Sequence, residues 1–97
     1  MIRNPSATFF VRVQGSSMTD ADIFDGDTLV VDRSLEPQLG QVIIAVVDGG
    51  LTVKRLSIKH SKVCLLAENP EYPPIELRND QELIIWGVVT NVIHPVK

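Results

Sequence analysis

Apolar and polar residues alternate along much of this chain, and residues that favour turns separate the alternating segments. Residues 8–14 follow a two-residue period, which is typical of a strand with one buried face. The run 41–47 is almost continuously β-branched and predicts a strand that is buried on both faces. The Asp-Gly-Gly sequence at 48–50 then predicts a two-residue hairpin turn, because these residues tolerate positive φ angles. We expect the segment 51–58 to be the partner strand.

Shorter apolar segments continue this pattern toward the end of the chain. They predict strands at 28–32, 63–67, 75–77 and 83–94. Gly87 lies inside the last of these segments and predicts a bend or a bulge there. One short helical turn is expected over 19–23, with Thr19 as its cap, and prolines stiffen a loop over 68–74. We therefore predict an all-β, β-dominated fold, a multi-stranded antiparallel β domain with at most a short helical turn.

Composition narrows the possible classes of protein. The 97 residues suffice for one hydrophobic core, so we expect residues 1–97 to form a single domain. A net charge of −3 and the lack of a basic helix argue against direct nucleic-acid binding by this domain alone. The sequence has neither an apolar run of the roughly 20 residues that span a membrane nor a signal-peptide core, so we expect a cytoplasmic protein without membrane contact. The single cysteine, Cys64, leaves no disulfide partner, and we expect no metal or cofactor.

Ser17 is the first candidate for chemistry. It follows Gly15 and Ser16 directly after the first predicted strand, where a serine taken alone is an ordinary loop residue. Gly15 permits a sharp turn that lifts the next residues out of the sheet. The backbone N–H groups of Ser16 and Ser17 could then point together at a developing oxyanion. Met18 would supply a flexible apolar side chain behind the serine.

Lys54 is the candidate base that such a serine needs. It lies on the strand predicted over 51–58, opposite the apolar segment 43–45. Burial there would lower the pKa of the lysine and favour the neutral amine, which is the form that accepts a proton. The alternative is a lysine whose stem packs on the sheet while its ammonium group reaches water. Arg55 faces the other side of the strand and stays charged, so it is not a candidate base.

The remaining polar residues do not form a second site by their spacing. His60 and His94 have no acidic residue at triad or metal spacing, and we expect both to be structural or to face solvent. The Lys-His-Ser-Lys group at 59–62 is expected to be a solvated hairpin turn. Four clustered aspartates lack the calcium-loop pattern and its terminal glutamate, so we expect them to form turns and caps. These aspartates are Asp20, Asp22, Asp25 and Asp27.

Three motifs in this order resemble the peptidase domain of LexA-type repressors and UmuD-type mutagenesis proteins. They are Val13-Gln14-Gly15-Ser16-Ser17-Met18, Asp25-Gly26-Asp27 and Thr52-Val53-Lys54-Arg55-Leu56. Segments at 5–10, 46–49, 68–75 and 86–89 also fit, so the resemblance covers nearly the whole chain. The opening segment is more similar to UmuD than to LexA.

This resemblance implies a self-cleaving serine–lysine endopeptidase with the β-rich fold of that family. Ser17 is similar to the family's nucleophile, Lys54 to its general base, and the backbone amides of Ser16 and Ser17 to its oxyanion hole. The resemblance also implies a homodimer and autocleavage stimulated by the RecA–single-stranded DNA filament. The cleaved product would join a UmuC-type polymerase as the accessory subunit of an error-prone translesion complex in the SOS response to DNA damage.

The chain departs from this family at its cleavage site. Family members cut an Ala-Gly or Cys-Gly bond in an upstream arm, and neither dipeptide occurs in this sequence. We therefore expect a catalytic core without its substrate arm, whose activity is latent or acts in trans. Ser16 stands where relatives often carry Asp or Met, which matters little at a position that contributes mainly its backbone.

Two other assignments stay open at this point. One is the C-terminal dimerisation and autocleavage domain of a LexA-type or phage-type transcriptional repressor. The other is a signal-peptidase-like enzyme, which shares a Ser-Met motif and a lysine base. The missing membrane anchor argues against the second.

Overall fold

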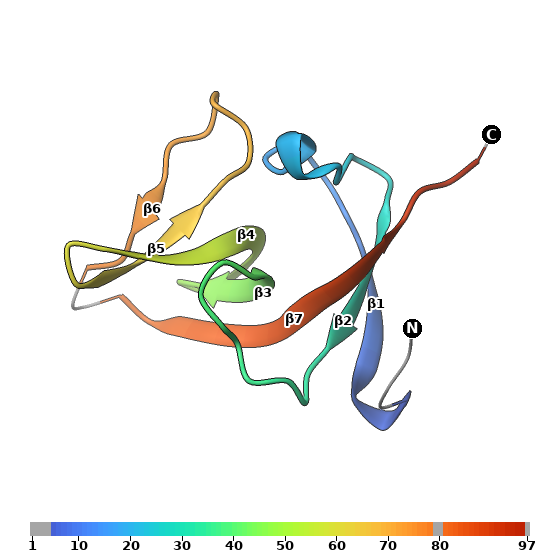
Figure 1. Cartoon of the computed structure of the whole chain (residues 1–97), viewed down its shortest axis with the longest axis horizontal. Coiled ribbons are helices and arrows are strands. Elements are labelled where there is room, and N and C mark those ends of the chain that lie inside the picture. The colour runs from blue at the N-terminus through green and yellow to red at the C-terminus, as the bar shows by residue number, and fades with distance from the viewer. Residues whose placement is uncertain (1–4, 79–80, 97) are drawn as a thin grey trace.

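The computed structural model of the chain describes residues 5–78 and 81–96 (Figure 1). Seven strands in these residues form one sheet in the order β1-β2-β7-β3-β4-β5-β6, and every neighbouring pair is antiparallel. The elements are η1 (Pro5–Ala7), β1 (Thr8–Arg12), η2 (Thr19–Ala21), β2 (Thr28–Asp32), β3 (Val42–Val47), β4 (Gly50–Lys59), β5 (Lys62–Leu66), β6 (Ile75–Glu76) and β7 (Leu83–Ile93). The two η elements are single 3₁₀ turns. The predicted antiparallel all-β fold is confirmed.

Two tight turns fix the register of the central strands. Asp48 and Gly49 have φ angles of 49° and 86° and form the predicted two-residue turn between β3 and β4. This turn places Lys54 directly opposite Ile43. The group 59–62 forms the second predicted hairpin turn, between β4 and β5. Local turn chemistry thus determines which residue of β3 faces the candidate base.

Strand β7 connects the two halves of the sheet, as its long ribbon in Figure 1 shows. Its first part pairs with β3 and its last part with β2, and its register shifts once against each neighbour. Against β3 the shift adds Trp86 as an extra residue, next to Gly87. A Cβ atom on Gly87 would lie 2.5 Å from Cγ1 of Val31, so the glycine allows a close approach to β2. The bulge predicted at this glycine is confirmed.

The apolar core consists of two clusters that share β3. Ile44 belongs to the first cluster, whereas Ile43 and Ala45 belong to the second. The strand is therefore buried on both faces at its centre, as its sequence predicts. The first cluster contains Val13, Met18, Ile23, Leu29, Val31 and Ile44. The second contains Ile43, Ala45, Leu56, Leu65 and Val88.

Some local predictions differ from the structure. The predicted cap of the helical turn is wrong, because η2 begins at Thr19 itself and the preceding Met18 makes no side-chain capping bond. Strand β1 ends at Arg12, two residues before the predicted end. Val13 still bonds through its backbone to Gly26 and Asp27, and the chain turns at Gly15. Residues 1–4, which belong to the segment that lacks a signal-peptide core, lie outside the described residues. The described part of the chain contains no helix long and apolar enough to cross a membrane.

Candidate active site

The β1–η2 loop, residues 13–18, carries Ser17 out of the sheet. Gly15 has a φ of 92°, in the left-handed region that glycine adopts without strain, and its N–H donates to Asp25 Oδ1 at 2.8 Å. Met18 ends the loop with its side chain buried in the first apolar cluster. The loop is therefore anchored on both sides of Ser17, and the turn expected from Gly15 is present.

Lys54 extends from β4 to the same point. Its Nζ lies 3.1 Å from Ser17 Oγ, although the two residues are 37 positions apart in the chain. Nζ also donates to Thr52 Oγ1 at 2.7 Å and to the Val53 carbonyl at 3.0 Å. An ammonium group has three donors, and these three contacts use all of them. Once deprotonated, the nitrogen has a lone pair that can accept the Ser17 hydroxyl proton. Sequence reasoning did not identify Thr52 as a partner of the lysine.

The surroundings of Lys54 favour its neutral form. The residue is only 7% exposed, and its cross-strand partner is the fully buried Ile43. Burial lowers the pKa of Lys54 below the usual value for lysine, because an ammonium group loses hydration in an apolar setting. Lys54 forms no ion pair with a carboxylate in the described part of the chain that would restore the charged form. The alternative of an ammonium group that reaches bulk water does not match this geometry.

The amides of Ser16 and Ser17 are available to a ligand. Within residues 5–78 and 81–96, no hydrogen bond uses either backbone N–H. The carbonyl groups of the same residues are engaged by Asn69 and Glu68 respectively. Their role as an oxyanion hole stays a prediction, and this arrangement leaves both donors open for it.

A cavity of about 400 Å³ lies over the Ser17–Lys54 contact. Strand β4 forms one wall, where residues 50–54 pair with β3 only, since pairing with β5 begins at Arg55. The Val53 carbonyl accepts a bond from Lys54 Nζ and therefore faces this open edge. The lining residues are Val11, Arg12, Val13, Gln14, Gly15, Ser16, Ser17, Met18, Ile44, Leu51, Thr52, Val53, Lys54 and Tyr72. The site thus combines a buried amine with an unpaired strand edge.

The β5–β6 loop, residues 67–74, adds contacts that sequence reasoning did not identify. Glu68, Asn69 and Tyr72 all bond to residues 16 or 17 of the β1–η2 loop. The sequence offered one signal for them, because the segment 68–75 matches the family motif without an assigned role. No local pattern could show which loop this segment contacts.

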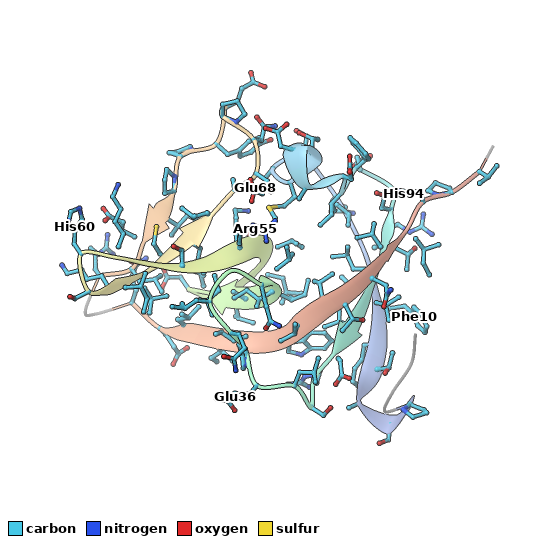
Figure 2. The ribbon with its side chains drawn as sticks, in the orientation of Figure 1. Phe10, Glu36, Arg55, His60, Glu68 and His94 are labelled. Carbon is cyan, nitrogen blue, oxygen red and sulfur yellow. The ribbon has the colours of Figure 1, made fainter. Side chains whose placement is uncertain are left out.

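His94, Asp25 and Asp27 have structural partners. His94 Nδ1 lies 2.7 Å from Asp27 Oδ2, so the expectation that His94 has no acidic partner is wrong. The pair is distant in sequence, which is why spacing along the chain did not reveal it. His60 lies at the tip of the β4–β5 hairpin, far from His94 (Figure 2), and neither lines the cavity. Asp25 and Asp27 accept bonds from backbone N–H groups, as expected for turn residues. Among the described residues, no group of three or more potential ligands could hold a metal ion.

The fold and this site define the class of the protein: an antiparallel β domain that holds a loop serine against a buried lysine. Comparison with known proteins agrees, because the Peptidase S24-like family model matches residues 1–90. The chain therefore belongs to the Peptidase S24-like family, which includes the LexA-type and UmuD-type proteins that its motifs resemble.

Individual relatives cover nearly the whole chain. Protein MucA of Salmonella typhimurium is 47% identical in an alignment that spans 98% of this chain and 66% of MucA. Protein SamA of the same species is 46% identical, over 99% of this chain and 66% of SamA. LexA repressor 1 of Pseudomonas syringae pv. tomato is 47% identical, over 93% of this chain and 45% of the repressor. The chain thus spans just under two thirds of the MucA and SamA chains and less than half of the LexA repressor.

Proposed function

We propose that Ser17 and Lys54 are the catalytic dyad of a self-cleaving serine endopeptidase. The observation that carries this proposal is the 3.1 Å contact between Lys54 Nζ and Ser17 Oγ in a largely buried setting. The neutral amine of Lys54 takes the hydroxyl proton while Oγ attacks a peptide carbonyl. The backbone N–H groups of Ser16 and Ser17 stabilise the resulting oxyanion.

The second half of the reaction uses the same groups. The Lys54 ammonium gives its proton to the leaving amine, and the peptide bond breaks. The amine of Lys54 then takes a proton from water, whose oxygen attacks the acyl carbonyl. The ester bond to Ser17 Oγ breaks, and Oγ takes back a proton from Lys54. Every proton is returned, so the cycle ends with the serine and the lysine in their starting forms.

An extended segment of polypeptide is the substrate that the site fits. Residues 51–54 of β4 have a neighbouring strand on one side only, and they line the cavity. A bound segment can add to this edge through backbone hydrogen bonds, which hold its carbonyl groups in register with Ser17. Such binding rests mainly on backbone hydrogen bonds, so it depends little on the side chains of the bound segment.

In the cell, we assign the chain to a UmuD-type protein of the SOS response. Its processed form would act as a homodimer and as the accessory subunit of a UmuC-type translesion polymerase, after cleavage promoted by the RecA–single-stranded DNA filament. The similarity to MucA and SamA over nearly the whole chain supports this assignment. The second candidate is the C-terminal domain of a LexA-type or phage-type repressor, which the 47% identity to a LexA repressor supports.

Cleavage of a supplied arm tests the peptidase proposal. A segment containing an Ala-Gly or Cys-Gly bond is fused to this chain, or added on a partner chain, and incubated at alkaline pH. Ser17→Ala and Lys54→Ala should each lower the cleavage rate by at least about 10³-fold, since each removes half of the dyad. Ser61→Ala and Lys62→Ala are matched controls in an exposed turn and should cleave normally. Robust cleavage by Ser17→Ala would refute the dyad.

A separate experiment distinguishes the two cellular roles. The coding sequence upstream of residue 1 should contain a short arm with a Cys-Gly or Ala-Gly bond if the protein is of the UmuD type. A helix-turn-helix domain at that place would establish the repressor instead. Either result leaves the chemical proposal for Ser17 and Lys54 unchanged.

A further inference from the structure

Glu68 of the β5–β6 loop holds the backbone at Ser17 and again at Asp20, three residues later. Its N–H donates to the Ser17 carbonyl at 2.9 Å. Its own carbonyl accepts from the N–H of Asp20, in η2, at 2.7 Å. Backbone bonds of this kind fix position without dependence on side-chain rotamers. Glu68 therefore defines where the segment 17–20 lies.

Two further residues of this loop hold Ser16. Asn69 Nδ2 donates to the Ser16 carbonyl at 2.7 Å, and the Tyr72 hydroxyl lies 3.1 Å from Ser16 Oγ. Together with the bonds of Glu68, these contacts attach one loop to the other over consecutive residues. The β5–β6 loop thus acts as a brace for the residue that bears the candidate nucleophile.

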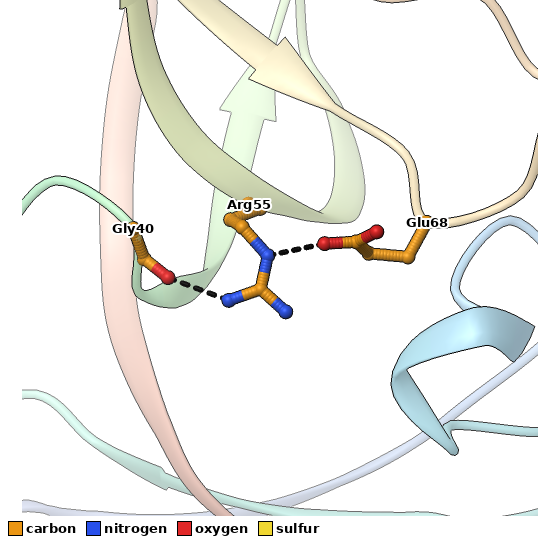
Figure 3. A network of polar contacts seen from close by, with 3 residues as sticks. All are labelled: Gly40, Arg55 and Glu68. Carbon is orange, nitrogen blue, oxygen red and sulfur yellow. Dashed lines mark hydrogen bonds and ion pairs between the residues drawn. The ribbon is translucent and has the colours of Figure 1, made fainter.

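The brace is tied in turn to the strand that carries Lys54. The Glu68 carboxylate accepts a charge-assisted bond from Arg55 Nε, and Arg55 Nη1 donates to the Gly40 carbonyl at 2.6 Å (Figure 3). Arg55 directly follows Lys54 on β4, and the two side chains leave the strand on opposite faces. The planar guanidinium group can hold the two acceptors at once, which a single ammonium group does less well.

The geometry points to Arg55 and Glu68 as positioning residues for the Ser17–Lys54 pair, an inference that rests on the proposed function. Ser17 and Lys54 come from the β1–η2 loop and β4, and β1 and β4 are not paired in the sheet. A short series of contacts connects Lys54 to Ser17. Arg55 follows Lys54 on β4 and bonds to the Glu68 carboxylate, and the Glu68 N–H bonds to the Ser17 carbonyl. Misplacement of reacting groups by about 1 Å can lower a rate about 10²-fold, so this link affects the chemistry.

A positioning role differs from a merely structural one in what it changes. The Arg55–Glu68 pair is one-third exposed on each side, and ion pairs in such settings add little to stability. Removing the pair should therefore change the reactivity of Ser17 more than it changes the unfolding temperature. Binding of a small probe in the cavity should be unaffected, because neither side chain lines it.

The test uses a small fluorophosphonate on this chain. Ser17 Oγ forms a bond to phosphorus as fluoride leaves, and Lys54 takes the hydroxyl proton, so labelling needs the dyad but no peptide substrate. Glu68→Gln keeps both backbone bonds and removes only the carboxylate charge. We expect its maximal labelling rate to fall about tenfold, with the concentration for half-maximal rate unchanged within about twofold.

Matched variants complete the design. Glu71→Gln makes the same change of charge at an exposed position of the same loop and should label like the wild type. Arg55→Lys should also lower the maximal rate, and it gives an independent reading if Glu68→Gln does not fold. The double variant should label no more slowly than the slower single variant, because both changes break one link. Unfolding temperatures of the folded variants should lie within a few degrees of the wild type.

The outcomes separate the two levels of inference. A wild-type chain that labels at Ser17, with folded Glu68→Gln and Arg55→Lys variants that label equally fast, would overturn the positioning role alone. A wild-type chain that does not label, or that labels as fast as Lys54→Ala, would contradict the dyad and the inference with it. A reduced maximal rate in either folded variant, beside normal labelling of Glu71→Gln, supports the link.

Discussion

Lys54 lowers the stability of the folded chain for the same reason that it suits the site. Burial lowers its pKa in the folded state, so the folded chain binds fewer protons than the unfolded chain at pH values between the lowered pKa and about 10.4. The free energy of unfolding therefore rises with pH across that window. Below the lowered pKa the full cost of the buried charge is present, and above about 10.4 it is absent.

Lys54→Met should consequently stabilise the chain at neutral pH. Methionine fills a similar volume without a charge, so we expect the free energy of unfolding to rise, because the cost of burying an ammonium group is removed. The gain over wild type should shrink as pH rises toward about 10.4. Urea denaturation at a series of pH values measures it, and a gain that stays constant with pH would contradict the assignment of the cost to the lysine charge.

The same ionisation should appear in the reaction rate. Only the neutral amine of Lys54 accepts the Ser17 proton, so the rate of cleavage or labelling should rise with pH and level off above the lowered pKa. Because burial lowers that pKa, the rate should reach its plateau at a lower pH than it would with a lysine of the usual pKa of about 10.4. Lys54→Arg keeps a cation at this position and should be inactive throughout. A rate that does not depend on pH, or that falls with rising pH, would exclude Lys54 as the base.

At the scale of the elements, the close approach of β7 to β2 depends on Gly87. A Cβ atom at Gly87 would lie 2.5 Å from Cγ1 of Val31, which forces a shift in packing between β7 and β2. Gly87→Ala should lower the free energy of unfolding by about 1–3 kcal/mol. Gly50→Ala is the control, because its new Cβ would meet only the Val47 carbonyl at 3.6 Å. Urea denaturation compares the two variants.

A second substitution tests the cause of that loss. Val31→Ala removes the methyl group that the new Cβ would meet, at the cost of a cavity of its own. In the Gly87→Ala background it should cost less stability than in the wild type, because it also relieves the clash. Strictly additive losses would show that the close approach to Val31 is not what requires glycine.

The elements also show where sequence reasoning succeeds. The turn at 48–49 and the doubly buried β3 follow from local patterns, and together they place Lys54 opposite Ile43. The bulge beside Gly87 follows from local sequence in the same way. Each of these features is encoded within a few consecutive residues, because turn geometry and strand periodicity are local properties.

Contacts between distant segments cannot be predicted from local sequence patterns in this way. The link from Arg55 to Glu68 and the contact of His94 with Asp27 depend on how distant segments pack together, which residue spacing does not encode. The Ser17–Lys54 contact is also distant in sequence. The chemistry of a loop serine and a lysine on an apolar strand suggested that pair, the family resemblance supported it, and the structure supplied its distance. The wrong cap at η2 has the same kind of cause, because Met18, which precedes this 3₁₀ turn, is held by tertiary packing in the first cluster.

At the scale of the whole molecule, the candidate site lies across the two apolar clusters. The loop of Ser17 is anchored by Met18 in the first cluster, whereas the strand of Lys54 contributes Leu56 to the second. The 3.1 Å contact between the two residues therefore requires the clusters to stay docked. Strand β7 pairs with β3 in one half of the sheet and with β2 in the other (Figure 1), and β3 contributes residues to both clusters, so these two strands join them. This continuity favours unfolding of the described chain in a single step.

Each apolar cluster has one residue next to it whose signal can report unfolding. The chain's single tryptophan, Trp86, packs against the first cluster. Its single cysteine, Cys64, is fully buried in β5 beside Leu65 of the second cluster. Burial raises the pKa of the Cys64 thiol, the nearby Glu76 charge raises it further and Lys59 opposes this. The native thiol is therefore both inaccessible and protonated, so a thiol reagent reacts only after the structure opens.

If the halves are coupled, the two probes must report the same opening. We expect Trp86 fluorescence and the rate of Cys64 labelling in urea to give the same free energy of unfolding, and the same dependence on urea, within about 1 kcal/mol. Labelling that proceeds at low urea while the fluorescence stays native would show that the β4–β5–β6 end opens by itself. In that case Lys54 would separate from Ser17 in the native ensemble, and a partner that clamps this end would raise the reaction rate. Coincident transitions would instead mean that the fold alone keeps the two residues in contact.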